Sequence, residues 1–88
     1  MSLQRRFDRA IKKVWRLNTR PDDDILLNLY ALYKQATEGD AGRRAQRRGI
    51  KEIAKFRAWK RIRGMTSNEA MISYCDLVKL LTTDKAAS

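Results

Sequence analysis

The stretch Asp22–Asp40, DDDILLNLYALYKQATEGD, decides the fold class of this chain. Its large apolar side chains recur at spacings of three and four residues, which is the periodicity of one face of an α-helix. The aspartates at its start supply a candidate cap and suit the positive end of a helix dipole, and Gly39 is a typical residue to end a helix. The stretch therefore predicts a helix over about residues 22–38.

Three further segments on either side show the same helical spacing, and none shows the strict alternation typical of a strand. The expected helices cover about residues 3–17, 22–38, 50–63 and 67–82. Thr66 and Glu69 have the spacing of a capping box, which predicts the start of the last helix. The polar residues 82–88 predict a frayed end. We therefore expect one all-α domain over residues 1–88.

The charge balance points to an anionic partner. Twenty Lys and Arg stand against ten Asp and Glu, a formal charge of +10, and the segment from Arg43 to Arg63 holds a single acid, Glu52. Such a balance fits a nucleic acid, an anionic membrane surface or a phosphorylated small molecule. The alternative is that most of these side chains form only a solvated helix surface.

Catalytic chemistry has few candidates in this sequence. The chain has no histidine, which removes the base of a Cys-His or Ser-His arrangement. One cysteine, Cys75, and scattered carboxylates show no metal-ligand spacing, and no glycine-rich phosphate loop is present. The sequence thus predicts no enzyme, no metal site and no cofactor.

The sequence also bears on location. No apolar run is long enough to span a membrane, and the first residues meet charge at Arg5 without an apolar stretch, so we expect no secretory signal. A single cysteine is compatible with a reducing compartment. We expect a cytoplasmic protein.

Aromatic and basic side chains coincide on the predicted helices. Tyr30 and Lys34 stand four residues apart on one face, with Tyr33 beside them. Other predicted helices add Lys51, Lys55 and Tyr74. A tyrosine ring can stack on a base and a lysine can contact a phosphate, so the set suits a nucleotide with several phosphates. Taken alone, however, the pattern is more typical of core tyrosines and solvated lysines.

Several motifs carry a resemblance to a known family. Residues 29–40 read LYALYKQATEGD, residues 54–59 read AKFRAW, and residues 64–71 read GMTSNEAM, followed by Tyr74. In this order they resemble the acyl-CoA-binding protein family, and the match runs from about Phe7 to Leu81. The resemblance implies an up-down-down-up four-helix bundle that holds one acyl-CoA molecule.

The resemblance also implies roles for the matched residues. Tyr30, Tyr33 and Lys34 would meet the adenine and the ribose 3′-phosphate. Lys55 would join Lys34 at the phosphate, and Tyr74 would contact the nucleotide and thioester region. The implied ligand contacts are Tyr30, Ala31, Leu32, Tyr33, Lys34, Lys51, Lys55 and Tyr74. The implied lining of an acyl groove near the first two helices is Ala10, Ile11, Leu26 and Leu27.

The function that this resemblance implies is reversible binding of medium- to long-chain acyl-CoA. The chain would be a monomeric intracellular carrier and pool former, with acyl-CoA as its ligand and not as a cofactor. Separately, the basic residues of the 43–63 region predict transient contact with anionic membrane surfaces. The alternative from the charge pattern is a small basic helical nucleic-acid-binding domain. A third hypothesis is an interaction module whose pocket has lost ligand binding.

The chain departs from the family pattern at three places. The segment before the third helix, RAQRRGI at residues 44–50, lacks the Pro-Gly that many members carry. Phe56 stands where the family has a first Trp, and Trp15 stands where members often have a basic residue. These departures bear on the loop, the grip on the phosphates and the preferred acyl length.

Overall fold

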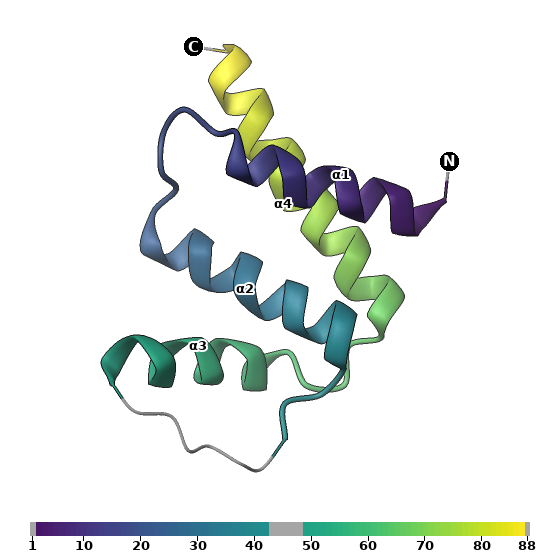
Figure 1. The fold of residues 1–88 in the computed structure, drawn as a ribbon, viewed down its shortest axis with the longest axis vertical. Helices are drawn as coiled ribbons and strands as arrows, with labels where there is room; N and C mark the ends of the chain where they lie inside the picture. Colours follow the sequence, from purple (N-terminus) through teal and green to yellow (C-terminus); the bar gives the residue numbers. More distant parts are fainter. Residues whose placement is uncertain (1, 43–48, 88) are drawn as a thin grey trace.

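The computed structural model describes residues 2–42 and 49–87. Its helices are α1 (Leu3–Trp15), α2 (Asp23–Glu38), α3 (Ile50–Arg61) and α4 (Ser67–Ala87) (Figure 1). No strand occurs within the described ranges. The all-α prediction is confirmed. The arginines predicted to lie in a loop at positions 43, 44, 47 and 48 fall outside the described residues.

The helices follow the predicted up-down-down-up order. In Figure 1, α2 and α3 run side by side in the same direction, while α1 and α4 run the opposite way. α2 packs against both α3 and α4, and α1 packs against α4. α2 therefore lies at the centre of the molecule, with α3 on one side and α4 on the other.

The main core fills the space between α1, α2 and α4. Its buried members are Phe7, Ala10, Leu29, Leu32, Ala36, Ala70, Tyr74 and Val78. The ring of Phe7 meets the ring of Tyr74 edge to face, with centroids 5.1 Å apart. A second buried cluster of Ala31, Ala41 and Trp59 joins α2 to α3. The helical spacing of apolar residues in α2 serves both clusters, since its opposite sides bury different residues.

The C-terminal end of α2 is bound to the rest of the fold by a buried amide. Gln35 is 1% exposed, and its Nε2 donates to Oδ1 of Asp40 and to the carbonyl of Met65, each at 2.8 Å. The same Asp40 oxygen accepts from the N–H of Gly64 at 2.7 Å. Buried polar groups stabilise a fold when they are paired, so this network fixes the approach to α4.

Two further hydrogen bonds secure the same end of α2. The Trp59 indole donates to the carbonyl of Gly39 at 2.8 Å, and the Ser67 hydroxyl donates to the carbonyl of Ala36 at 2.6 Å. Gly39 has a φ of 84°, a conformation that glycine adopts without strain. The motif that ends α2 thus joins α3 and α4 to it.

The ends of α1 and α3 lie slightly earlier than predicted. α1 ends at Trp15 and not at residue 17, because the N–H groups of Arg16 and Leu17 bond carbonyls three residues back. Ile62 and Arg63 do the same after α3, which ends two residues before its predicted limit. Such tighter turns commonly close α-helices.

The boundaries of α2 and α4 also differ from the sequence prediction. Asp22 occupies the N-cap position of α2 but makes no capping side-chain hydrogen bond, while Asp23 pairs with Arg20 at 2.9 Å. α4 continues to Ala87, beyond its predicted end at residue 82. Lysine and alanine in that segment have high helix propensity, which favours continuation.

The capping box at the start of α4 is confirmed. The backbone N–H of Glu69 donates to the Thr66 hydroxyl at 3.1 Å, and the N–H of Thr66 donates to the Glu69 carboxylate at 2.9 Å. Each side chain thus satisfies a backbone N–H that has no partner within the helix.

Acid should destabilise the protein partly through two carboxylates, Asp40 and Glu69. The N–H of Gly64, then the Gln35 amide, lowers the pKa of Asp40 below 3.8, and the N–H of Thr66 lowers the pKa of Glu69 below 4.5. As the pH falls, these carboxylates therefore take up protons in the unfolded state before they do so in the folded state. Their contribution to stability is complete above the ordinary pKa values and is lost as the pH falls through the folded-state pKa values. In urea unfolding between about pH 5 and about pH 2, an Asp40→Asn/Glu69→Gln variant should lose less stability than the wild type. Equal losses in both proteins would contradict this assignment.

Candidate functional site

A groove of about 410 Å³ runs between the first turns of α2 and α3. Its lining comes from α2, from α3 and from the segment just before α2. The lining residues are Arg20, Asp23, Leu26, Leu27, Tyr30, Ile50, Lys51, Ala54 and Lys55. We call it the α2–α3 groove.

The polar part of the α2–α3 groove carries net positive charge. The ammonium of Lys55 lies 5.3 Å from the centroid of the Tyr30 ring and 3.6 Å from the Glu52 carboxylate. Lys51 stands one helical turn earlier, and Arg20 lies across the groove in a pair with Asp23. Three cations face one acid in the lining, so the groove attracts an anion.

The apolar part of the same groove is open to a hydrocarbon. Leu26, Leu27 and Ala54 are half-buried, and Ile50 leaves 87% of its surface exposed. A ligand with a charged head and an apolar tail would satisfy both parts, since each apolar carbon that leaves water stabilises the complex.

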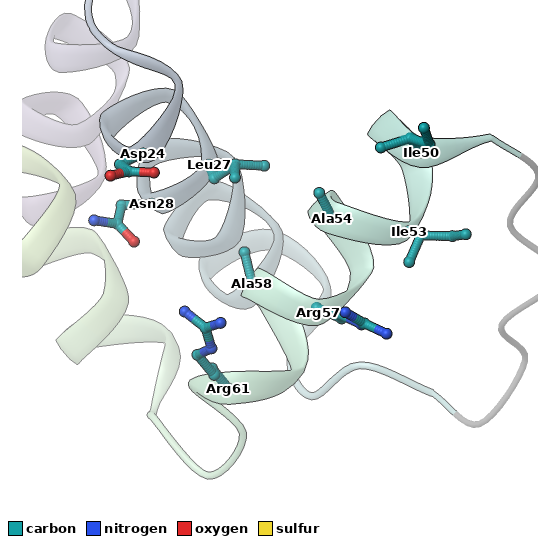
Figure 2. Close-up of a pocket in the computed structure, with 9 residues that line it drawn as sticks. All are labelled: Asp24, Leu27, Asn28, Ile50, Ile53, Ala54, Arg57, Ala58 and Arg61. Atoms are coloured by element: carbon teal, nitrogen blue, oxygen red, sulfur yellow. The ribbon is translucent and has the colours of Figure 1, made fainter.

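A second groove, of about 560 Å³, continues from the first over Leu27, Ile50 and Ala54, which line both. Figure 2 shows Ile50 and Ile53 on the first turns of α3 and Arg61 near its end. On α2 it is lined further by Asp24 and Asn28, and on α3 by Arg57 and Ala58. The α2–α3 pair therefore offers a continuous apolar seam with polar groups on both sides.

Two predicted ligand residues lie beside the α2–α3 groove without lining it. The ammonium of Lys34 pairs with Glu38 and lies 5.1 Å from the centroid of the Trp59 ring. Tyr33, 41% exposed, stacks on Phe7 with ring centroids 6.1 Å apart. Lys34 thus lies on the side of α2 that faces α3, as Tyr30 does, whereas Tyr33 lies on the side that faces α1.

Tyr74 lies in the core and not in the groove. It is 5% exposed, and burial, with smaller contributions from Tyr33 and Cys75, raises its pKa to about 12. Its ring packs against Phe7. The structure thus separates Tyr74 from the pair of Tyr30 and Lys55.

Four other predicted site residues lie elsewhere in the fold. Ala31 and Leu32 were predicted as ligand contacts, but both are buried in the core clusters because they face α3 and α4. Ala10 and Ile11 were predicted in an acyl groove near α1 and α2. Ala10 is buried against α4 and Ile11 packs on the main core, so the apolar side of α1 is already covered. An apolar groove of the structure lies between α2 and α3. The contact of Ala10 and Ile11 with an acyl chain stays a prediction.

The sequence prediction also missed four lining residues, namely Arg20, Asp23, Ile50 and Ala54. Ile50 and Ala54 stand four residues apart, each directly before a predicted lysine. That spacing places an apolar pair next to a basic pair on one helix, and it was available in the sequence.

Within residues 2–42 and 49–87, no cluster of three or more His, Cys, Asp or Glu side chains is arranged to hold a metal ion. No helix in the described part of the chain is long and apolar enough to cross a membrane.

Comparison with known proteins identifies the family. The family model described as "Acyl CoA binding protein" matches residues 4–78. The chain belongs to the acyl-CoA-binding protein family. An acyl-CoA-binding protein homolog of Manduca sexta is 43% identical over 84 residues, which cover 92% of each chain. The acyl-CoA-binding protein of Brassica napus is 40% identical over 89 residues, covering 100% of this chain and 97% of the relative.

A solved structure agrees with this family assignment. The crystal structure of Oryza sativa acyl-CoA-binding protein 2 superposes on this family member with a TM-score of 0.87 and 37% sequence identity. The superposition covers 99% of this chain and 98% of the rice protein. The acyl-CoA-binding protein fold is therefore confirmed, and these matches give no support to the nucleic-acid-binding alternative.

Proposed function

We propose that this chain binds medium- to long-chain acyl-CoA esters reversibly, one molecule at a time, in the α2–α3 groove. The observation that carries the proposal is the meeting of cations and apolar side chains in one groove of a chain that belongs to this family. Acyl-CoA has both chemistries in one molecule, since its phosphates are anionic and its tail is a hydrocarbon.

The nucleotide end would lie at Tyr30, Lys51 and Lys55. The Tyr30 ring offers a surface for the adenine, and its contact with Lys55 holds an ammonium beside that surface. Lys34 and Tyr33, also on α2, would extend the contact surface, and Lys34 would exchange Glu38 for a phosphate. Ammonium groups make point-charge contacts with phosphate oxygens, so several lysines can share the phosphates of one ligand.

The acyl tail would lie over Leu26, Leu27 and Ala54 and cover Ile50. Removing these side chains from water supplies the preference for acyl esters over free CoA. Tyr74, Ala31 and Leu32 would act from the core by fixing the helices that carry the groove, and not as direct contacts.

A binding role without chemistry fits the residues of the groove. None of its lining side chains is a histidine or a cysteine, and the thioester would meet lysines and a tyrosine that hold the ligand. The protein would keep a detergent-like ester in solution and release it intact, as a monomeric cytoplasmic carrier.

Lys55→Met should weaken palmitoyl-CoA binding by about 10- to 100-fold, because a charge-assisted hydrogen bond contributes about 1.5–3 kcal/mol. The substitution removes the charge and keeps most of the stem. Calorimetric titration measures the change, and Tyr30→Ala should weaken binding as well by removing the ring that adenine would stack on.

Lys60→Met is the matched control. Lys60 is an exposed lysine of the same helix that lines neither groove, so its loss should change the dissociation constant by less than about twofold. Equal weakening by both methionine variants would place the site elsewhere. No heat and no thermal shift with palmitoyl-CoA would overturn the proposed function.

A further inference from the structure

The second groove joins the α2–α3 groove at an apolar seam and carries polar side chains beyond that seam. Leu27, Ile50 and Ala54 form the seam, because they line both grooves. On α2 the second groove adds Asp24 and Asn28, which lie one turn apart on a side of the helix that the α2–α3 groove does not include. A ligand tail that crosses the seam therefore comes next to polar groups.

Two arginines of α3 give the second groove its charge. Arg57 and Arg61 are exposed and four residues apart on the helix, and both line this groove. In Figure 2 the guanidinium of Arg61 extends toward Asn28 of α2, whereas that of Arg57 extends away from α2. Neither arginine forms an ion pair with an acid of the described residues. Asp24 is the one acid in the lining, so an anion at this end meets more positive than negative charge.

Small side chains connect the seam to Arg61. Ala54, Ala58 and Arg61 share one face of α3, and both alanines are half-buried. Arg61 follows Ala54 by two helical turns, which is about 10 Å along the axis. An extended carbon chain advances about 1.2 Å per bond, because three backbone bonds span about 3.6 Å, so about nine bonds cover this distance. A tail of about 12 carbons that begins near Ala54 therefore reaches Arg61.

We propose that the second groove takes acyl-CoA esters whose tail ends in a second carboxylate, with Arg61 as the partner of that ω-carboxylate. This inference rests on the proposed function and specifies a ligand class for the same site. An unpaired carboxylate in an apolar groove costs free energy, so such a tail needs a cation where it ends. A guanidinium can donate two parallel N–H groups to one carboxylate, and the Asn28 amide offers a further donor on the opposite helix.

Calorimetric titration with dodecanedioyl-CoA and dodecanoyl-CoA tests this proposal. The quantity measured is the ratio of the two affinities, in which the contribution of the nucleotide cancels. The ratio should be one or more in the wild type and should fall about tenfold in Arg61→Met, the lower range for hydrogen bonds to charged groups because Arg61 is exposed. Arg61→Lys should keep part of the ratio, since it keeps the charge and loses the fork of donors.

Two further variants report on the surroundings of Arg61. Lys60→Met is the matched control, because Lys60 is exposed on the same helix and lines neither groove, and it should change the ratio by less than about twofold. Asp24→Asn should raise the ratio by up to about fivefold, because it removes the one acid of the second groove.

A pair of short esters tests whether the tail has to reach Arg61. The acyl chains of glutaryl-CoA and pentanoyl-CoA are too short to extend from Ala54 to Arg61. Arg61→Met should therefore leave the affinity ratio of this short pair unchanged. An equal fall for the short and the long pair would mean that Arg61 attracts anions from a distance, which overturns the proposal.

Other outcomes separate this inference from the proposed function. A dodecanedioyl-to-dodecanoyl ratio that Arg61→Met does not lower would overturn the inference and leave the proposed function intact. Tighter binding of ω-hydroxydodecanoyl-CoA than of dodecanedioyl-CoA would assign this end of the groove to a hydroxyl group and would also overturn it. If dodecanoyl-CoA itself does not bind, the proposed function fails and this inference fails with it.

Discussion

Palmitoyl-CoA should bind about three to four orders of magnitude more tightly than free CoA. The difference arises because a buried methylene contributes about 0.8 kcal/mol, so about six methylenes leaving water contribute about 5 kcal/mol. The seam of Leu27, Ile50 and Ala54 continues from the α2–α3 groove into the second groove, which gives a long tail more surface to cover. Calorimetric titration with a series of acyl-CoA esters of increasing length measures the slope directly.

A single substitution tests the contribution of the acyl tail to the affinity separately from that of the nucleotide. Leu27→Asn should reduce the affinity for palmitoyl-CoA and leave that for free CoA almost unchanged, because Leu27 contacts only the proposed tail. Leu80→Asn is the control, since Leu80 is 61% exposed on α4 and lines neither groove. An affinity that does not depend on acyl length would contradict the assignment of the seam.

Phe7→Ala should lower the free energy of unfolding by about 3–5 kcal/mol, the usual cost of truncating a fully buried phenylalanine. The Phe7 side chain is 1% exposed and meets two tyrosine rings, one from α2 and one from α4. Its removal leaves a cavity where three helices meet. Urea unfolding followed by circular dichroism at the helical band measures the loss.

The matched control for this prediction is Trp15→Ala on the same helix. Trp15 is larger than Phe7 but mostly exposed, so its truncation should change the free energy of unfolding by less than about 0.5 kcal/mol. Similar losses in the two variants would contradict the assignment of Phe7 to the core, because alanine has the higher helix propensity at both positions.

Phe7→Ala also connects stability with the site. The Phe7 ring stacks on Tyr33, which belongs to the predicted ligand surface, and meets Tyr74 edge to face. The aromatic series thus extends from the surface of α2 into the core. Tyr33 therefore lies at the surface and Tyr74 in the core, a difference that the sequence alone does not show.

Local sequence features predicted most of the secondary structure. The spacing of apolar residues placed all four helices, and the Thr66–Glu69 capping box placed the start of α4 within one residue. Both depend on contacts within a few residues along the chain, which a single sequence contains in full. α4 continues past its predicted end at residue 82 to Ala87. Lys85, Ala86 and Ala87 are good helix formers, whereas Thr82, Thr83 and Asp84 are not, so propensity alone did not predict this end.

Three residues of the stretch 29–40 explain why this stretch is decisive for the fold. Gln35, Gly39 and Asp40 each bond to a residue at least 20 positions later, namely to Met65, Trp59 and Gly64. The resemblance to a family identified these residues together, but only the folded chain shows that they hold α3 and α4 against α2.

The candidate site could be predicted only in part. Leu26, Leu27, Tyr30, Lys51 and Lys55, which the family resemblance named as ligand or acyl-groove residues, line one groove of the structure. Their contact with a ligand stays a prediction. The sequence does not show which side of each helix is covered by a neighbouring helix. Ala10, Ala31 and Leu32 have the same apolar character as the groove residues, and their burial follows from the pairing of helices.

The sequence by itself determined the helices, the capping box of α4, the excess of positive charge and the membership of the family, because each of these depends on residue identity and near neighbours. The tertiary structure decided the rest. It placed the apolar groove between α2 and α3, moved Tyr74 into the core and left the indole of Trp15 exposed. The physical reason is that burial depends on which helix faces pack together, and in this fold that packing joins residues far apart along the chain.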